Sequence, residues 1–326
     1  MKILIVSNEY QSEKRQGNPI VNRIMVATEK DKRVDSVSFC PFFNRLSCFP
    51  IIRRSAKGVD VVHIHFGGVY ALLIWFSLIG VRIPKVITFH GTDIHGKEAK
   101  TTKSILAILR IRLNQLSSVL SFFLFDKVGL VSETLISYVP RFVYQATKRK
   151  VFVQPLGVDY DLFKIVPKTE ALEKLGLRNA HYVLFSDKTN TPLKRRDLAE
   201  AIVKLLGNYE LLLMCGVRPE LVPNYINASD FTLLTSDEEG SPNIVRESLA
   251  LNKRVFSVDV GDVGSQIRGL CNSMIISRDP QIAASQIENS LKIPYTDNTR
   301  FLYKDRMDFS RIIKDVVDIY DALIHG

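Results

Sequence analysis

The chain has 326 residues, of which 46% are apolar and 24% are charged, and its formal net charge at pH 7 is +10. This composition excludes a disordered or fibrous protein, and the length predicts roughly two domains, each with its own hydrophobic core. The charge is uneven: residues 1–160 hold 23 basic and 11 acidic side chains, a net charge of +12, whereas residues 161–326 hold 21 and 23, a net charge of −2.

The basic first half indicates an anionic partner, which could be nucleic acid, a phosphorylated small molecule or an anionic membrane surface; a generally basic proteome is the plainer alternative. The four cysteines have neither CxxC spacing nor the density of a disulfide-stabilised secreted domain. They are Cys40, Cys48, Cys215 and Cys271. The first residues lack the apolar core of a signal peptide. We therefore expect a cytoplasmic protein, with the inner face of the cell membrane as a further location.

Apolar runs rich in β-branched residues alternate with longer helical patterns through the first half of the chain. They are Lys2–Ser7, Val34–Cys40, Asp60–Phe66, Lys85–Gly91, Lys127–Ser132 and Lys150–Pro155. Strands that are almost entirely Val, Ile and Leu, separated by helices, are typical of a parallel sheet covered on both faces. The first half is therefore predicted to be a doubly wound α/β domain.

A second series of strands follows. It comprises Tyr182–Asp187, Tyr209–Cys215, Asp230–Ser236, Arg254–Asp259 and Ser273–Ser277. Pro155, Gly157 and Pro167 interrupt the pattern between the two series, so we place a domain boundary near residue 160 and a second Rossmann-like domain at residues 161–300. Residues 301–326 carry apolar side chains at helical spacing, which predicts one amphipathic helix packed on the body of the protein. This helix could cross back to the first domain.

Two apolar segments raise the question of a membrane. The run Gly67–Val81 is shorter than the ~20 residues that span a bilayer, so we interpret it as a buried helix. The basic, Leu-rich segment Lys100–Phe125 predicts an amphipathic helical region. Its interpretation stays open between an ordinary surface helix and a helix that docks on anionic lipid.

Polar loops follow four of the predicted strands, at the edge of a parallel sheet where ligands bind. One of them, "DEEGSPNIVRE" at Asp237–Glu247, places Glu239 before a Gly-Ser-Pro-Asn turn and Glu247 inside the helix that follows. Free N–H groups at the start of that helix favour a phosphate, and Glu247 could accept paired hydroxyls. An acidic helix N-terminus stabilised by the helix dipole is the alternative. Asp237 and Glu238 are interpreted as solvated loop charges.

A basic loop in the same predicted domain supplies the opposite charge. Lys188 and Lys194, with Arg195 and Arg196, follow the strand at Tyr182–Asp187. Lysines at this position could neutralise a diphosphate, although exposed loop lysines are usually only solvated.

Several ordered motifs together resemble the retaining, nucleotide-sugar-dependent glycosyltransferases of family 4. The E-x7-E signature matches at Glu239 and Glu247, and supporting matches are "TFHGTD" at Thr88–Asp93, "QPLGVDYDLF" at Gln154–Phe163 and "LKRRDLAEAIVKL" at Leu193–Leu205. The resemblance implies the GT-B fold, in which two Rossmann-like domains face each other across a cleft, with acceptor bound by the first domain and donor by the second.

The resemblance also implies a role for each matching residue. Glu239 would hold hydroxyls of the donor sugar, Glu247 the ribose, and the turn of Gly240, Ser241, Pro242, Asn243 and Ile244 would offer N–H groups to sugar and phosphate. Lys194 matches the phosphate-binding lysine, Lys188 stands where the family commonly has an arginine, and His90 matches a histidine that contacts the donor sugar. Gly17 and Asn18 lie in the loop near acceptor and diphosphate, where only one glycine of a glycine-rich turn is present.

The expected activity is retaining transfer of a sugar from a donor such as a UDP- or GDP-sugar to a glycan or lipid-linked acceptor, in cell-surface polysaccharide or glycolipid synthesis. No cofactor or obligatory metal is implied, and no nucleic-acid-binding motif accompanies the basic half. We take His63 and His65 to lie on opposite faces of a strand, which argues against shared metal ligation. A nucleotide-sugar epimerase, a phosphorylase and a catalytically inactive GT-B scaffold remain as alternatives.

Overall fold

The computed structural model describes residues 1–8, 19–42, 48–96, 104–187, 191–295 and 299–326. These residues form two compact units, which we call unit 1 (Met1–Leu156 with Ser310–Gly326) and unit 2 (Gly157–Phe309). The chain therefore passes from unit 1 to unit 2 between Leu156 and Gly157, a few residues before the expected boundary near residue 160. It returns between Phe309 and Ser310.

Unit 1 is built on a six-stranded parallel sheet with the strand order β2-β1-β3-β4-β5-β6. Its strands are β1 (Lys2–Asn8), β2 (Ser36–Phe42), β3 (Val61–His65), β4 (Lys85–Phe89), β5 (Lys127–Leu130) and β6 (Val151–Val153). All five residues of β3 are buried, as expected for a strand inside a parallel sheet that is covered on both faces. Two of them, His63 and His65, are polar.

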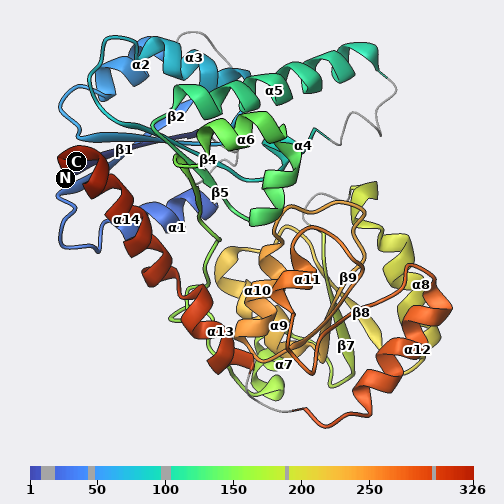
Figure 1. Cartoon of the computed structure of the whole chain (residues 1–326). Helices are drawn as coiled ribbons and strands as arrows, with labels where there is room; N and C mark the ends of the chain where they lie inside the picture. The colour runs from blue at the N-terminus through green and yellow to red at the C-terminus, as the bar shows by residue number, and fades with distance from the viewer. Residues whose placement is uncertain (9–18, 43–47, 97–103, 188–190, 296–298) are drawn as a thin grey trace. The chain divides into compact units, whose positions relative to one another are not determined.

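Helices cover both faces of this sheet. They are α1 (Pro19–Thr28), α2 (Cys48–Ser55), α3 (Val69–Ser77), α4 (Thr92–His95), α5 (Ile105–Leu124), the 3₁₀ helix η2 (Glu133–Tyr138), α6 (Arg141–Thr147) and α14 (Phe309–His325). Figure 1 shows α2, α3 and α5 on one side of the sheet and α1 and α14 on the other. By length and composition, α5 is the one helix among the described residues that is long and apolar enough to cross a membrane.

Unit 2 has a five-stranded parallel sheet in the order β11-β10-β9-β7-β8. The strands are β7 (Tyr182–Ser186), β8 (Glu210–Met214), β9 (Phe231–Leu234), β10 (Arg254–Ser257) and β11 (Met274–Ile275). The helices are α7 (Lys168–Leu175), η3 (Pro192–Lys194), α8 (Arg196–Leu206), η4 (Pro219–Leu221), α9 (Val222–Ala228), α10 (Asn243–Ala250), α11 (Val263–Gln266), α12 (Pro280–Leu291) and α13 (Thr299–Met307). Helices α8 and α12 lie together on one side of the sheet in Figure 1, and α9 and α10 lie on the other.

Each of the eleven strand segments expected from the sequence overlaps a strand, and both sheets are parallel, so the expected α/β class is confirmed. The single helix expected at residues 301–326 is wrong. The helical pattern is interrupted at Asp308, which forms an isolated β-bridge with Val158, and the Val158 N–H donates to the Met307 carbonyl oxygen at 2.8 Å. This backbone pairing ends α13 in unit 2, and α14 then buries Ile312, Val316 and Tyr320 in unit 1.

Candidate functional site

The strand order of unit 2 reverses between β7 and β9, and this point locates a candidate ligand site. Strand β7 pairs with β8 on one side and with β9 on the other, and all run parallel. Ligands of open α/β sheets bind beyond the carboxyl ends of the strands at such a reversal. The loop after β7 carries Lys194, and the loop after β9 carries Glu239.

Lys194 and Glu239 form an ion pair at this edge. The Lys194 Nζ lies 2.5 Å from the Glu239 Oε1, and the two side chains are 26% and 14% exposed. The Ser236 hydroxyl donates to the same Oε1 at 2.8 Å. The structure thus brings together two site residues that are 45 positions apart in the sequence, with a polar contact that holds the carboxylate.

Backbone contacts fix the lysine loop against the end of β9. The Thr235 hydroxyl donates to the carbonyl oxygens of Lys194 (3.0 Å) and Arg195 (2.9 Å), and the Asp237 N–H donates to the Leu193 carbonyl oxygen at 2.8 Å. Arg195 adopts a left-handed conformation with φ of 51°, which is uncommon for a residue with a side chain. The position of Lys194 is therefore determined by the fold of unit 2 and not only by its ion pair.

The interpretation of Asp237 as a solvated charge is wrong. Its Oδ1 lies 2.7 Å from the Arg278 Nη1 and 3.5 Å from the Arg195 Nη1. Arg278 also donates to the Ser236 carbonyl oxygen at 3.1 Å. Asp237 therefore helps to anchor the loop that carries Glu239, because a partly exposed carboxylate with two guanidinium partners is held in place.

The turn between Glu239 and Glu247 is held by a buried arginine. Arg246 in α10 is 1% exposed, and its guanidinium donates to the Ser241 hydroxyl, to the Ser241 carbonyl oxygen at 2.9 Å and to the Asn243 Oδ1 at 2.5 Å. The Ser241 hydroxyl donates in turn to the Asp262 Oδ2 at 2.6 Å. Burial lowers the pKa of Arg246 from its usual value, and nearby Asp262 and Glu247 oppose this shift.

A second loop supports the same turn. Gly261, which follows β10, has φ of +57°, and a Cβ atom there would lie 2.6 Å from the Gly240 carbonyl oxygen. The Gln266 Nε2 donates to the Asp262 Oδ1 at 2.5 Å, and the Tyr303 hydroxyl donates to the Gln266 Oε1 at 3.2 Å. The backbone at Gly240 is therefore packed directly against the backbone at Gly261, which leaves little freedom for the turn.

The remaining expected residues of unit 2 are placed as follows. Pro242 directly precedes α10, Asn243 is its first residue, and Ile244 and Glu247 are buried within it. Lys188 lies outside the described residues, as do Gly17 and Asn18 of unit 1. Arg246, Asp262 and Gly261 are further residues around this turn that were not expected from the sequence. The polar, glycine-containing loop "VGDVGS" after β10 was a signal for Gly261 and Asp262. Arg246 had no signal, because an arginine between Val245 and Glu247 has the pattern of a surface residue.

In unit 1, His90 follows β4 and lies half-buried beside the buried His63 and His65. The His65 Nδ1 and the His90 Nε2 lie 3.1 Å apart, and the Phe66 ring stacks on His90 with centroids 4.3 Å apart. Phe66 has φ of +74°, a strained backbone of the kind that collects at functional sites. The His65 Nε2 and the His90 Nδ1 are buried and have no hydrogen-bond partner in the described part of the chain.

These histidines are neutral at physiological pH. Burial lowers the pKa of His63 and of His90 to about 3, and burial together with the neighbouring histidines lowers the pKa of His65 well below its usual value. A neutral imidazole has one donor and one acceptor nitrogen. Since the two rings share one contact, each retains one buried nitrogen that a bound ligand could satisfy.

Asp93 shapes the loop that holds His90. Its carboxylate accepts N–H donation from Gly67 at 2.8 Å, from His90 at 3.0 Å and from Gly91 at 2.8 Å. Burial raises the pKa of Asp93 while these backbone hydrogen bonds lower it, and the net direction is upward. The loops after β3 and β4 are thus joined through one carboxyl group.

The expectation that His63 and His65 lie on opposite faces of a strand is wrong, because residues two apart in a strand share a face. Their rings stack with centroids 4.3 Å apart. His63 contacts the Tyr320 hydroxyl of α14 at 2.5 Å and the Thr88 hydroxyl at 2.8 Å, so both of its nitrogens are used within the protein. No group of three or more His, Cys, Asp or Glu in the described ranges could hold a metal ion.

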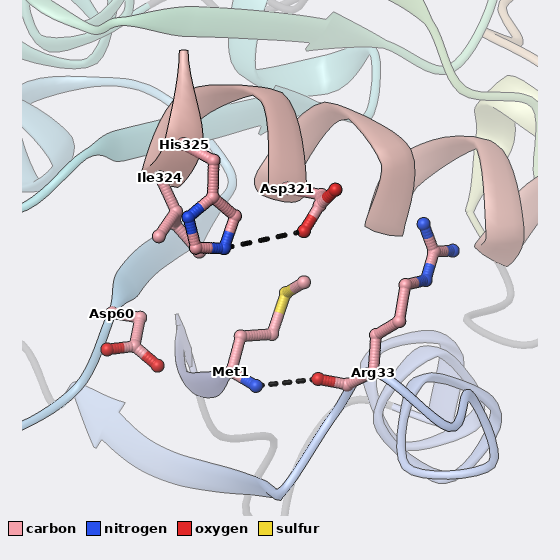
Figure 2. Close-up of a pocket in the computed structure, with 6 residues that line it drawn as sticks. All are labelled: Met1, Arg33, Asp60, Asp321, Ile324 and His325. Carbon is pink, nitrogen blue, oxygen red and sulfur yellow. Dashed lines mark hydrogen bonds and ion pairs between the residues drawn. The ribbon is translucent and has the colours of Figure 1, made fainter.

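A separate pocket in unit 1 contains none of the expected site residues. It is lined by Met1, Arg33, Asp60, Asp321, Ile324 and His325, as Figure 2 shows. Met1 directly precedes β1 and Asp60 directly precedes β3, so the pocket opens at the amino ends of the strands. Ligands of this fold class bind at the opposite edge. We therefore assign the candidate site of unit 2 to the loops of Lys194 and Glu239, and that of unit 1 to the loop of His90.

Comparison with known proteins finds likeness in structure alone. No protein-family model and no curated protein matches this chain. Sucrose-phosphate synthase from Thermosynechococcus elongatus matches with a TM-score of 0.76 and 16% identity over 99% of this chain and 98% of that one.

Two further solved structures match over nearly the whole of both chains. HepE from Anabaena, solved in complex with UDP, has a TM-score of 0.73 and 17% identity over 99% of this chain and 100% of that one. A glycosyltransferase from Rickettsia africae has a TM-score of 0.68 and 16% identity over 100% and 99%. At these identities the likeness shows the fold, and this chain has the GT-B fold of two parallel-sheet α/β domains.

Proposed function

We propose that the protein is a retaining glycosyltransferase of the family 4 type, which moves a sugar from a nucleoside diphosphate to a glycan or lipid-linked acceptor. The observation that carries this proposal is the Lys194–Glu239 ion pair at the strand-order reversal of unit 2. A cation of the kind that binds phosphate and a carboxylate of the kind that binds hydroxyls thus lie together at one edge of a sheet. The likeness to HepE, which was solved with UDP, supports a nucleotide donor.

The donor would exchange the contacts within this pair for its own. A diphosphate would compete with Glu239 for Lys194. The freed Glu239 carboxylate would then accept hydrogen bonds from hydroxyl groups of the sugar. The N–H groups at the start of α10, behind the turn that Arg246 holds, favour the same phosphates. Buried Glu247, one turn further along α10, is proposed to accept the ribose hydroxyls.

Transfer then breaks the bond between the anomeric carbon and the diphosphate oxygen, and the electron pair leaves with the diphosphate. The acceptor hydroxyl forms the new bond on the same face, and its proton passes to the departing phosphate oxygen. Lys194 and the α10 N–H groups stabilise the developing negative charge, which is where preorganised donors contribute most. His90, neutral and with a buried unsatisfied Nδ1, is proposed to serve the transfer step rather than nucleotide binding.

Calorimetric titration with UDP, GDP and ADP tests the donor site. At least one of them should bind the wild-type chain, and Lys194→Ala should weaken that binding by roughly 10- to 100-fold, because it removes a charge-assisted contact to phosphate. Lys204→Ala, in exposed sequence at the end of α8, is the matched control and should bind like the wild type. Absence of binding by all three nucleotides, or equal binding by both variants, would overturn the proposal.

Mass spectrometry of donor turnover separates an enzyme from an inactive scaffold. A panel of nucleotide sugars should show slow donor hydrolysis without acceptor, and Glu239→Gln should reduce it by about 10²- to 10³-fold, as loss of one preorganised contact does. A chain that binds the nucleotide but turns over no donor with any acceptor is the scaffold.

A further inference from the structure

Helix α5 turns its serines toward unit 1 and most of its leucines outward, and its two arginines are exposed as well. Ser117, Ser118 and Ser121 are buried, whereas apolar side chains along the opposite side are 44–81% exposed. A surface helix of a soluble domain normally shows the reverse pattern. Helix α8 of unit 2 is an example, since it buries Leu198, Ile202 and Val203 against its core.

The inward polar groups are bonded to the loops of unit 1. The Asn114 Oδ1 accepts the Val69 N–H at 3.2 Å, and the Gln115 Nε2 donates to the His95 carbonyl oxygen at 3.0 Å. The Ser118 hydroxyl accepts the Gly68 N–H at 2.9 Å and donates to the Asp93 carbonyl oxygen at 2.6 Å. These contacts fix the orientation of α5, so its leucines face outward as a consequence of specific bonding.

The exposed apolar residues form a continuous stripe, which we call the α5 stripe. They are Leu106, Leu109, Leu113, Leu116, Leu120 and Phe123, with Ile105 at the start. Their alternating spacing of three and four residues keeps them on one side of a helix. Isolated exposed leucines need no explanation, but a line of this length on one helix marks an interaction surface.

The charges on α5 decide between the occupants of this surface. The helix has Arg110 and Arg112 and no acidic residue. At about 3.6 residues per turn the two arginines fall on opposite sides of the α5 stripe. A second copy packed along the stripe would bring arginines near arginines without the opposite charges that stabilise paired helices. An anionic bilayer surface instead offers apolar acyl chains to the leucines and lipid phosphates to the arginines.

We propose that the α5 stripe docks on the surface of an anionic lipid bilayer, with the helix lying along the membrane. The leucines enter the boundary between headgroups and acyl chains, and Arg110 and Arg112 contact lipid phosphates. The helix does not cross the bilayer, because its inward Asn, Gln and Ser side chains are already bonded to unit 1. Through Ser118 and Asp93 the docked helix adjoins the His90 loop, so the bilayer lies next to the loops of unit 1.

Vesicle co-sedimentation with the full chain tests the docking surface. Wild-type protein should sediment with vesicles of equal parts phosphatidylglycerol and phosphatidylcholine, and less with phosphatidylcholine alone. The double variant Leu109→Gln/Leu116→Gln should bind the mixed vesicles at least about tenfold more weakly, because two apolar side chains no longer enter the lipid. Ile165→Gln/Ile282→Gln, at exposed positions of unit 2, is the matched control and should bind like the wild type.

A second pair of variants tests the charge contribution. Arg110→Gln/Arg112→Gln should lose roughly tenfold or more of the binding to mixed vesicles, with little change on phosphatidylcholine alone. Arg178→Gln/Arg218→Gln in unit 2, where both arginines are exposed, is its control. The melting temperature and nucleotide binding of all variants should match the wild type, since none of the changed side chains is buried.

Three outcomes would overturn the proposal. The first is wild-type protein that stays in the supernatant with the mixed vesicles. The second is equal vesicle binding by the stripe variant and its control. The third is a wild-type dimer, measured by light scattering, that the stripe variant abolishes without any change in vesicle binding, which would assign the stripe to a second copy. The single variant Leu106→Gln, at a position 79% exposed, repeats the test if the double variant is unstable.

Discussion

The two sheets are similar in topology, but the side chains at the carboxyl ends of their strands differ in charge. In unit 2 the edge holds charged groups, with Lys194 and Glu239 in an ion pair and Asp237 between two arginines. In unit 1 the corresponding edge holds His65 and His90, which burial keeps neutral. Both sheets are parallel and both reverse their strand order once, so the difference lies in the loops.

This difference in charge leads us to expect that the two units bind different parts of the substrates. Charges that are fixed but partly exposed suit a ligand with phosphates, which brings opposite charge and replaces the existing pair. A buried, neutral cluster excludes ions and instead presents hydrogen-bonding nitrogens, which suits uncharged hydroxyl groups. We therefore expect nucleotide affinity to depend on unit 2 alone, and turnover to depend on both units.

The sharpest test of this division compares Lys194→Ala with His90→Ala. The lysine variant should lose both nucleotide affinity and turnover, whereas the histidine variant should keep nucleotide affinity and lose about 10²- to 10³-fold in turnover. Calorimetry with the bound nucleotide and mass spectrometry of the sugar product give the two readouts. If His90→Ala weakens nucleotide binding as much as Lys194→Ala does, the carboxyl edges of the two sheets do not have separate roles.

A large loss of stability is expected when the guanidinium of Arg246 is removed. Arg246→Met deletes the donors to Ser241 and Asn243 inside unit 2, and the free energy of unfolding should fall by about 3 kcal/mol, as it does when buried charged networks lose one member. Arg196→Met removes an exposed arginine paired with Glu200 and should cost less than about 0.5 kcal/mol. Urea unfolding followed by circular dichroism measures both, and equal losses would show that Arg246 does not hold the turn.

Some of this site could be read from the sequence and some could not. The strands were predictable because continuous Val, Ile and Leu have one stable arrangement in a parallel sheet. The position of Lys194 and Glu239 at the carboxyl edge of the sheet was predictable, because each follows the end of a strand. Arg246 was not, because nothing in "IVRES" shows that its guanidinium turns back to bond the preceding turn.

Other differences have the same origin in long-range contacts. The break at Asp308 depends on pairing with Val158, which is far away in the sequence, so helical periodicity alone could not reveal it. The inward serines of α5 likewise depend on bonds to Gly68 and Asp93. Local patterns determined the elements, whereas contacts between distant loops determined the ends of elements and the orientation of their faces.

An intermediate effect is expected at Gly261, where the two loops of the unit 2 site touch. Gly261→Ala combines a left-handed backbone with a Cβ placed 2.6 Å from the Gly240 carbonyl oxygen, and it should cost about 1–3 kcal/mol and weaken nucleotide binding. Gly216→Ala has a similar φ of +61° but open space around the Cβ, and it should cost about 1 kcal/mol.

Gly264→Ala completes this series of urea unfolding measurements. Its Cβ would lie 3.9 Å from the nearest side-chain atom, inside α11, so the change should be neutral or stabilising by up to about 1 kcal/mol. If Gly261→Ala costs no more than Gly216→Ala, the close approach of the two loops does not constrain the turn.

The smallest expected effect concerns the buried histidines of unit 1 and appears as a dependence on pH. The folded-state pKa of His63 is about 3, below the value near 6.5 of an unfolded chain. The unfolded state therefore binds more protons below pH 6.5, and the contribution of His63 to stability is lost as the pH falls toward 3. Each such histidine contributes up to about 1.4 kcal/mol per pH unit to the slope of the free energy of unfolding against pH. Asp93, whose pKa is raised, contributes a slope of the opposite sign.

Trp75, the one tryptophan of the sequence, lies in α3 and donates its indole N–H to the Leu124 carbonyl oxygen, so its fluorescence reports unfolding of unit 1. Urea unfolding between pH 7 and pH 5 should show a shallower pH slope for His63→Gln than for the wild type, because the substituted residue no longer titrates. His181→Gln, at an exposed position of unit 2, should leave that slope unchanged. Equal slopes for His63→Gln and the wild type would mean that His63 is protonated in the folded unit as readily as in the unfolded chain, which would contradict its burial as a neutral imidazole in β3.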